Sequence, residues 1–213
     1  MNITKFGHCC LLLEERGVRI LTDPGTMSTG EHEVRDLDAI VITHEHADHF
    51  HIDSVKVIRT NNPSAVIITN AAVGALLAKE NIPFTQVGDG ESTEVKGVAI
   101  SGHGKEHATI YEQMGACENT SFMIDGKLFF PGDAFHNPKM PVDILALPTA
   151  GPWMKIAEAI EYAKALKPRI AFPVHDAIYQ PAFAGFVAHM TEMFLEPTGI
   201  AFTPLAAGET QEF

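Results

Sequence analysis

The residues of this sequence best suited to chemistry lie in the segment Thr-His-Glu-His-Ala-Asp-His at positions 43–49, which holds three histidines and one aspartate. An apolar run at residues 37–42 precedes it, as is typical of a buried strand that ends in a loop. In an extended chain His44 and His46 point to the same side and can share one metal ion. The aspartate and the last histidine follow where the chain must turn. Because imidazole and carboxylate groups are zinc ligands, this segment predicts a metal site.

Further residues of the same chemistry follow other apolar runs. Asp133 comes soon after one such run and His175 directly after another, and a glycine-containing loop earlier in the chain adds His103 and His107. Taken singly, Asp133 also fits a turn acid and His175 a helix cap. Strands fix the backbone while the loops at their ends carry chemistry, so these side chains are expected to converge with the 43–49 segment. With one of the two loop histidines the set reaches seven ligands, which are enough for two metal ions with open positions.

Composition limits the function classes. A length of 213 residues and 46% hydrophobic content fit one globular domain over residues 1–213, and a net charge of -12 argues against a nucleic-acid partner. The amino terminus has no cationic run before an apolar segment, and no stretch approaches 18 apolar residues, so we expect a cytoplasmic protein with no membrane partner. Cys9, Cys10 and Cys117 show no C-x-x-C spacing, which indicates neither disulfides nor a thiolate site.

The remaining patterns predict alternating strands and helices. Helices are expected at residues 50–58, 71–80, 153–167 and 182–195. Strands are expected at residues 2–6, 9–14, 18–21, 38–42, 65–69, 84–87, 93–101, 121–124, 127–130, 142–147, 169–174 and 200–203. Hairpin, strand and helix recur in each half of the chain without a residue-level repeat.

The motif H-x-H-x-D-H at positions 44–49 resembles the signature of the metallo-β-lactamase-fold hydrolases. This resemblance implies an α/β protein with an αββα four-layer sandwich, in which helices flank two mixed sheets. The segments Phe6-Gly7-His8, residues 20–24, Phe130-Pro131-Gly132-Asp133 and residues 173–176 are similar to landmarks of the branch that contains ascorbate-phosphate lactonase. The resemblance thus covers most of the chain.

The resemblance also assigns the ligands to two ions. The first ion takes His44, His46 and His107, the second takes Asp48, His49 and His175, and Asp133 bridges the two. His103 is the alternative to His107, because a histidine directly after the strand is the simpler pattern, whereas the Gly-x-Glu-His-Ala pattern of this branch favours His107.

Three further residues have roles that the resemblance leaves open. Asp23 is expected to orient a liganding histidine, with an Asx turn before Pro24 as the alternative. His8 and His136 are candidates for the pocket. Trp153 is a candidate too, but a core or helix-start position is favoured for it.

The implied reaction is hydrolysis of an ester, lactone, amide or phosphodiester of a small molecule. A hydroxide shared by two divalent ions attacks, Asp48 orients it and Asp133 holds the ions together, so both aspartates count as catalytic. Zinc is expected, with manganese and iron as alternatives. Lactones and phosphorylated metabolites are the first substrate guesses by resemblance.

Two other classes remain open. Di-iron redox members of the fold have glutamate at the second histidine of the motif, and His46 argues against that class. A metal-binding scaffold without activity is disfavoured by the intact ligand set. The sequence leaves both a monomer and a homo-oligomer open.

Overall fold

The computed structural model describes residues 1–115 and 117–213. Its helices are α1 (Ile52–Asn61), α2 (Ala71–Lys79), α3 (Ile156–Leu166) and α4 (Pro181–Leu195), with 3-10 turns η1 (Glu31–Glu33), η2 (Glu112–Met114) and η3 (Glu196–Thr198). Its strands are β1 (Asn2–Gly7), β2 (Cys10–Glu15), β3 (Val18–Thr22), β4 (Ala39–Ile42), β5 (Val66–Thr69), β6 (Thr85–Gln86), β7 (Ser92–Val95), β8 (Val98–His103), β9 (Ser121–Ile124), β10 (Leu128–Phe130), β11 (Ile144–Pro148), β12 (Ile170–Val174), β13 (Ala201–Phe202) and β14 (Thr210–Glu212).

The strands form two seven-stranded sheets of matching design. One sheet has the order β14-β1-β2-β3-β4-β5-β6 and the other the order β13-β12-β11-β10-β9-β8-β7. In the first sheet β14, β1, β2 and β3 are antiparallel neighbours, and β3 to β6 run parallel. In the second sheet β7 to β10 are antiparallel and β10 to β13 are parallel. Both sheets are therefore mixed.

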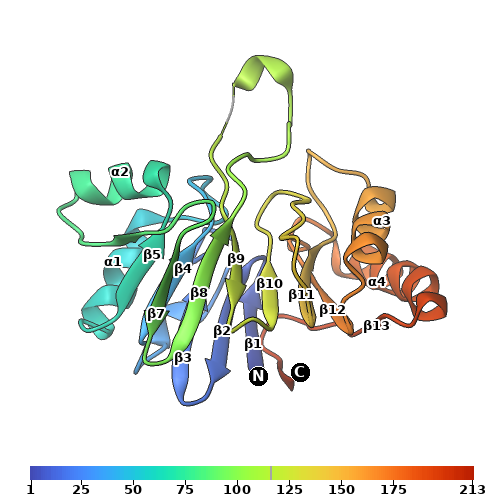
Figure 1. Cartoon of the computed structure of the whole chain (residues 1–213), viewed down its shortest axis with the longest axis horizontal. Helices are drawn as coiled ribbons and strands as arrows, with labels where there is room; N and C mark the ends of the chain where they lie inside the picture. The colour runs from blue at the N-terminus through green and yellow to red at the C-terminus, as the bar shows by residue number, and fades with distance from the viewer. Residues whose placement is uncertain (116) are drawn as a thin grey trace.

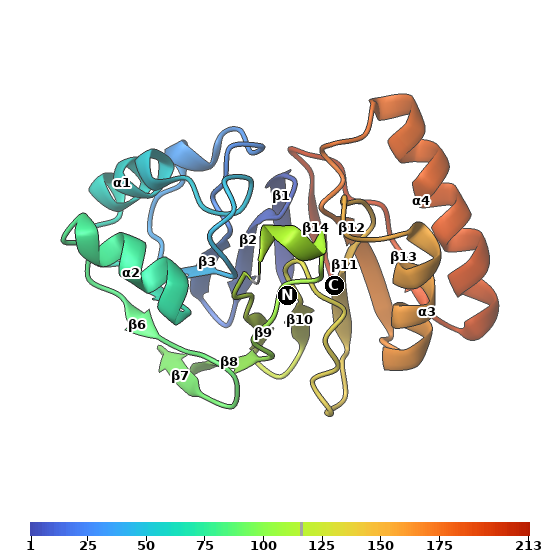
Figure 2. The same ribbon diagram turned by 90° about the horizontal axis from the view of Figure 1, so that it is seen from above.

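The sheets lie face to face and each carries helices on its outer side. Figures 1 and 2 show α1 and α2 outside the first sheet and α3 and α4 outside the second, so the layers follow one another as helix, sheet, sheet, helix. The expected αββα sandwich is confirmed. The two ends of the chain meet, since the amino group of Met1 donates to the carbonyl of Phe213 at 3.1 Å.

Alternation along the strands divides the core into three layers. In β2, Leu11 and Leu13 pack between the sheets, whereas Leu12 packs under α1 and α2. In β10, Phe130 packs between the sheets and Phe129 under α3 and α4. These strands are buried on both faces, which explains why they appear in the sequence as continuous apolar runs instead of alternating ones.

Parallel strands bring the chemical segments to one edge. β4 leads into the 43–49 segment, β10 into Asp133 and β12 into His175. Because β4 is parallel to β3 and β5, and β10 to β11 and β12, their carboxyl ends meet at one edge of each sheet. The fold thus gives the candidate ligands a common location.

Three elements differ from the sequence expectation. Residues 93–101 form the hairpin β7–β8 instead of one strand, because Lys96 and Gly97 take the left-handed backbone of a tight turn. The helix expected from residue 153 begins at Ile156, where the backbone N–H of Lys155 donates to the Glu158 carboxylate at 2.6 Å. β14 is too short and polar to be predicted alone and exists through pairing with β1.

The helices of the described residues are all too short or too polar to cross a membrane.

Candidate metal centre

The loop that follows β4 is held by Asp23, which ends the hairpin β2–β3. The Asp23 carboxylate accepts hydrogen bonds from the Thr43 backbone N–H at 2.8 Å and from the Thr43 hydroxyl at 2.7 Å. Gly25 lies so close to the same loop that a Cβ on it would sit 1.9 Å from the Asp48 carbonyl oxygen. The loop therefore has one defined shape, and any larger residue at position 25 would push it away.

A first group of candidate ligands joins this loop to two others. His44 and His46 meet His107 and Asp133, and one ligand atom from each lies within 4.8 Å of the rest. The His44 Nε2 atom is 3.2 Å from His46 Nδ1, and the His107 Nε2 atom is 3.3 Å from an Asp133 oxygen. Such spacings fit ligand atoms that surround one cation at about 2.0–2.2 Å each.

A second group lies next to the first and contains His8, Asp48, His49 and His175, again with ligand atoms within 4.8 Å. The Asp48 Oδ2 atom is at the centre, 3.2 Å from His8 Nε2, 3.5 Å from His175 Nε2 and 3.8 Å from His49 Nε2. Three of these four residues were expected together. His8 is the addition.

Asp133 lies between the two groups. Its Oδ2 atom is 3.3 Å from His107 Nε2 and 3.0 Å from His175 Nε2, and its Oδ1 atom is 3.1 Å from His49 Nε2. It thus touches members of both groups, as a bridging carboxylate must. The indole N–H of Trp153 donates to its Oδ2 atom at 2.8 Å and fixes the carboxylate.

The donor set itself indicates a cation. Several buried atoms of these residues, among them His49 Nε2, His107 Nε2, His175 Nε2 and Asp133 Oδ1, have no hydrogen-bond partner in the described structure. Buried polar atoms without partners are rare in folded proteins and each carries a desolvation penalty. Metal ions would give all of these atoms a partner, so the residues fit a pair of metals.

In three of the histidines the other ring nitrogen has a partner, which leaves the inward nitrogen free to ligate. His49 Nδ1 donates to Asp23 at 2.7 Å, and His107 Nδ1 to the Ala108 carbonyl at 2.5 Å. His44 Nδ1 lies 3.0 Å from the Thr43 hydroxyl, whose own proton goes to Asp23. Contacts of this kind orient metal-binding histidines and select their tautomer. Asp23 therefore makes the contact expected of it, and it serves two rings.

Charge within the site favours the protonation states that bind cations. Burial lowers the pKa of His44 well below its usual value and also lowers that of His46, so both rings are neutral. Burial opposes ionisation of Asp48 and Asp133, but the surrounding histidines outweigh it and keep both pKa values below the usual one. Both aspartates are thus ionised and can bind cations.

His49 shows the opposite behaviour. Burial disfavours its charged form, yet the carboxylates of Asp133 and Asp23 outweigh burial and raise its pKa well above the usual value. His175 is raised in the same direction by Asp133 and Asp48 against burial. Without metal these two rings hold protons, and an incoming cation must displace them.

The structure separates the two candidates for the third histidine. His107 is in the first group, whereas His103 ends β8 with its Nε2 atom 3.0 Å from the Ser101 hydroxyl and belongs to neither group. His107 is carried inward because its backbone N–H donates to the Cys117 carbonyl at 3.0 Å.

His8 was a candidate for the pocket, but not for the ligand set. It follows β1 in a corner where the pairing with β2 shifts register, and its own φ of 50° is left-handed. Its carbonyl accepts the His175 backbone N–H at 3.2 Å, which joins this corner to the end of β12. A glycine and a polar residue that interrupt a hairpin were the available signal, since such bulges redirect side chains.

Trp153 and His136 complete the candidates. Trp153 is buried, as expected, but it belongs to a turn before α3 and contacts Asp133, so its core position and its place in the site coincide. The His136 carbonyl accepts from Tyr162 at 2.5 Å, and its ring lies against Gly104, outside both groups.

Lys5 supports the site from below. Its side chain is 2% exposed, and Nζ donates to both oxygens of Asp176 at 2.7 and 2.8 Å and to the Pro173 carbonyl at 2.9 Å. These bonds hold the segment on either side of His175, whose φ of 59° needs such restraint.

Comparison with known proteins gives the same picture. Residues 2–175 match the Beta-lactamase superfamily domain. A protein of Mycobacterium tuberculosis is 37% identical over 199 residues, covering 91% of this chain and 92% of that protein. A UPF0173 metal-dependent hydrolase of Thermoplasma acidophilum is 28% identical over 189 residues, covering 82% and 83%.

Solved structures share the fold at low identity. A metallo hydrolase of Ignicoccus hospitalis has a TM-score of 0.79 at 23% identity and covers 100% of this chain and 98% of its own. A diiron β-hydroxylase of Streptomyces venezuelae has a TM-score of 0.75 at 14% identity, covering 100% of this chain and 54% of its own. With most of its length matched by one family, this chain belongs to the β-lactamase superfamily.

Proposed function

We propose that this protein is a metal-dependent hydrolase with a binuclear site. The observation that supports it best is the position of Asp133, whose carboxylate lies within 3.3 Å of histidines from both ligand groups. A single carboxylate shared by two groups of histidines is the arrangement that two-metal hydrolases require. The curated relative of Thermoplasma acidophilum carries the name of a metal-dependent hydrolase, which agrees with this proposal.

The chain offers a complete set of ligands for both ions. His44, His46 and His107 would hold the first, His8, Asp48, His49 and His175 the second, with Asp133 between them. Zinc is our proposal because imidazole dominates the set, and manganese or iron would accept the same ligands. A pair of such ions lowers the pKa of water and polarises a carbonyl or phosphoryl oxygen.

The side chains around the ions have distinct tasks. Asp48 is the most exposed carboxylate of the site, with 25% of its side chain accessible, so it is placed to accept a proton from water and to orient it. Asp133 is buried and fixed by Trp153, which suits a structural bridge. We propose esters, lactones, amides or phosphodiesters of small molecules as substrates.

The redox alternative has no support from the site residues. A diiron β-hydroxylase shares the fold, but similarity at 14% identity extends to the fold only. Di-iron redox members of the fold carry glutamate at the position of His46. This chain has an imidazole there, so its motif resembles that of the hydrolases.

Chelation and reconstitution test the proposal. We expect hydrolysis of a panel of activated esters, lactones and phosphodiesters, its loss after removal of metal with a chelator, and its return when zinc or manganese is added. A matched control is Asp143→Asn, because Asp143 pairs with Arg169 on the surface away from both groups. Activity that survives complete metal removal would contradict the proposal.

A further inference from the structure

A cavity of about 320 Å³ opens directly onto the first ligand group. His46 and His107 form part of its wall, and the rest comes from the loop that carries η2. In Figure 1 this loop projects from the top of the molecule beyond the strand ends, and Figure 2 shows it over the middle. A substrate whose reacting group lies at the metal centre would place its remainder in this cavity.

The wall of this cavity carries negative charge. Glu45 and Glu106 line it, and its other described lining residues include neither lysine nor arginine. Neither glutamate forms an ion pair within the described part of the chain. Lys105, next to Glu106 in the chain, lines the adjoining cavity with Asp89, and the two cavities share Glu106 and His107.

Exposed apolar groups complete the wall. Tyr111 is 58% and Met114 68% exposed, and both line the cavity. They place an aromatic ring and a thioether in the same wall as the two carboxylates. An aromatic face beside carboxylates is the combination that recognises organic cations, above all alkylated ammonium groups.

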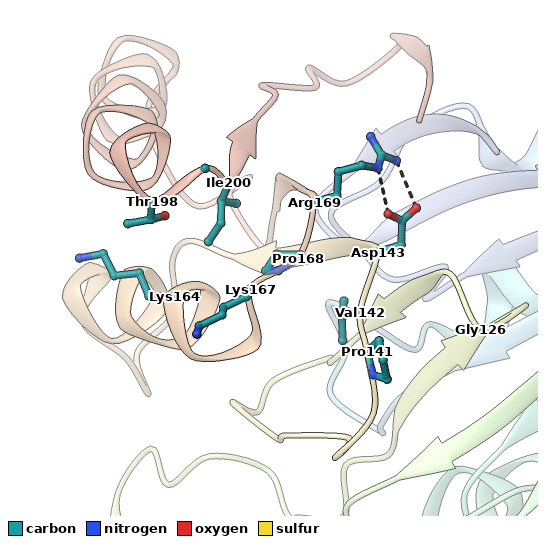
Figure 3. A pocket seen from close by; sticks show the side chains of 11 residues that line it. Gly126, Pro141, Val142, Asp143, Lys164, Lys167, Pro168, Arg169, Thr198 and Ile200 are labelled. Carbon is teal, nitrogen blue, oxygen red and sulfur yellow. Dashed lines mark hydrogen bonds and ion pairs between the residues drawn. The ribbon is translucent and has the colours of Figure 1, made fainter.

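The basic part of the surface lies elsewhere. A larger cavity of about 740 Å³, drawn in Figure 3, is lined by Lys164, Lys167 and Arg169 at the opposite ends of β11 and β12. Arg169 is paired with Asp143 there, and Lys164 with Glu161. These three basic residues thus lie away from the metal centre, and the net charge of -12 favours the approach of cations.

We propose that the substrate is an organic cation, an ester, lactone or amide that carries an ammonium group. Its ammonium group lies between Glu45, Glu106 and Tyr111, while its carbonyl lies at the metal centre. The proposal rests on the hydrolase function proposed above and specifies its substrate class. Organic cations take the place of the phosphorylated metabolites expected from the sequence, because a phosphate in this cavity would meet two carboxylates that lack cationic partners.

Three alcohols of equal shape test the cavity, and their acetates test the reaction. Choline is cationic, 3,3-dimethylbutan-1-ol is its neutral isostere and isethionate is an anion. Binding of the alcohols to the metal-loaded protein is followed by ligand-observed NMR, and hydrolysis of the acetates by titration of the released acid. We expect choline to bind about 10-fold more tightly than its isostere, with a similar preference in kcat/KM.

Variants test whether the preference for choline over its neutral isostere comes from the two glutamates. The double variant Glu45→Gln and Glu106→Gln should bring the choline preference close to one without changing metal content. Glu94→Gln, an exposed glutamate on β7, should leave the preference intact. Equal binding of the three alcohols, stronger binding of isethionate, or a preference unchanged in the double variant would overturn the proposal.

The two proposals fail in different ways. Preferential binding of choline without cleavage of any acetate would support the cation site and count against the hydrolase. Cleavage of all three acetates at equal rates would support the hydrolase and overturn the cation site.

Discussion

The two ligand groups of this protein differ in how firmly the fold holds them. In the second group the side chains of His8, His49 and His175 are at most 2% exposed. In the first group His46 is only half-buried and His107 is carried by a loop that borders a cavity. The histidines of the second group thus all lie in the core, whereas the first group reaches the cavity through His46. Asp48 is the exposed ligand of the second group.

Their supporting contacts differ in the same sense. Asp23 fixes His49, and the buried Lys5–Asp176 pair fixes the turn that carries His175. His46, by contrast, makes a polar side-chain contact only with His44 among residues 1–115 and 117–213. We therefore expect the second group to bind its ion more tightly and to exchange it more slowly than the first.

The largest effect is expected at Asp133, because it contacts both groups. Asp133→Ala should abolish binding of one ion and weaken that of the other, and hydrolysis should fall by about 10³-fold or more. Elemental analysis and initial rates on any substrate of the wild type provide the measurement. A variant that kept two ions and near wild-type rates would show that this carboxylate is no bridge.

Next comes the first group. His107→Ala should lose about one equivalent of metal, since one of three imidazoles is removed and the loop cannot replace it. His103→Ala is the matched control, as its ring contacts Ser101 and stands outside both groups. Metal titration of the two variants measures how many ions each one binds. A loss of metal in His103→Ala but not in His107→Ala would show that His103 is the third ligand.

The variant His8→Ala is expected to reduce metal binding by the second group less than His107→Ala reduces it in the first, because Asp48, His49 and His175 remain. We expect metal affinity there to drop about 10- to 100-fold with faster exchange, the range measured when a residue around a metal site is lost. Competition with a coloured chelator measures it. An unchanged affinity and exchange rate would make His8 a packing residue only.

A similar but smaller loss is expected for Asp23→Asn. The amide keeps the hydrogen bonds to Thr43 in part, but it no longer stabilises the correct tautomer of His49. Metal affinity of the second group should fall by about 10-fold. The same competition assay, with the first group as internal reference, would reveal an equal loss in both groups if Asp23 only supports the loop.

The smallest effect concerns pH without metal. The raised pKa of His49 stabilises the metal-free fold fully below its usual value of 6.5, and this stabilisation is lost as pH rises through the raised value. The lowered pKa of Asp133 stabilises the fold above 3.8 and is lost as pH falls through the lowered value. Urea unfolding should show highest metal-free stability between these limits. With metal bound, stability should keep rising above pH 6.5, since protons no longer compete.

The sequence predicts well which residues follow a strand, and poorly which residues far apart in the chain come into contact. The 43–49 segment and Asp133 follow apolar strands directly, so their placement could be expected from strand ends alone. The four-layer fold was available from the resemblance of the motifs. His8 had a weak local signal, the Gly7-His8 interruption of the β1–β2 hairpin, which did not predict that its side chain joins the ligands. Trp153 depends on a turn before α3 that has no local signature. His107 was preferred over His103, which ends its strand, through a motif resemblance alone.

Predictions that the fold does not test keep that status. They include zinc as the metal, the cytoplasmic location, the lactonase branch and the choice between monomer and homo-oligomer.

The most direct test of the binuclear site is the number of metal ions per chain after zinc loading and desalting, measured by elemental mass spectrometry. The two groups joined by Asp133 predict two ions per chain, one released quickly to a chelator and one slowly. A single ion, or two ions released at the same rate from wild type and His8→Ala alike, would contradict the account of a firm second group and an exchangeable first group.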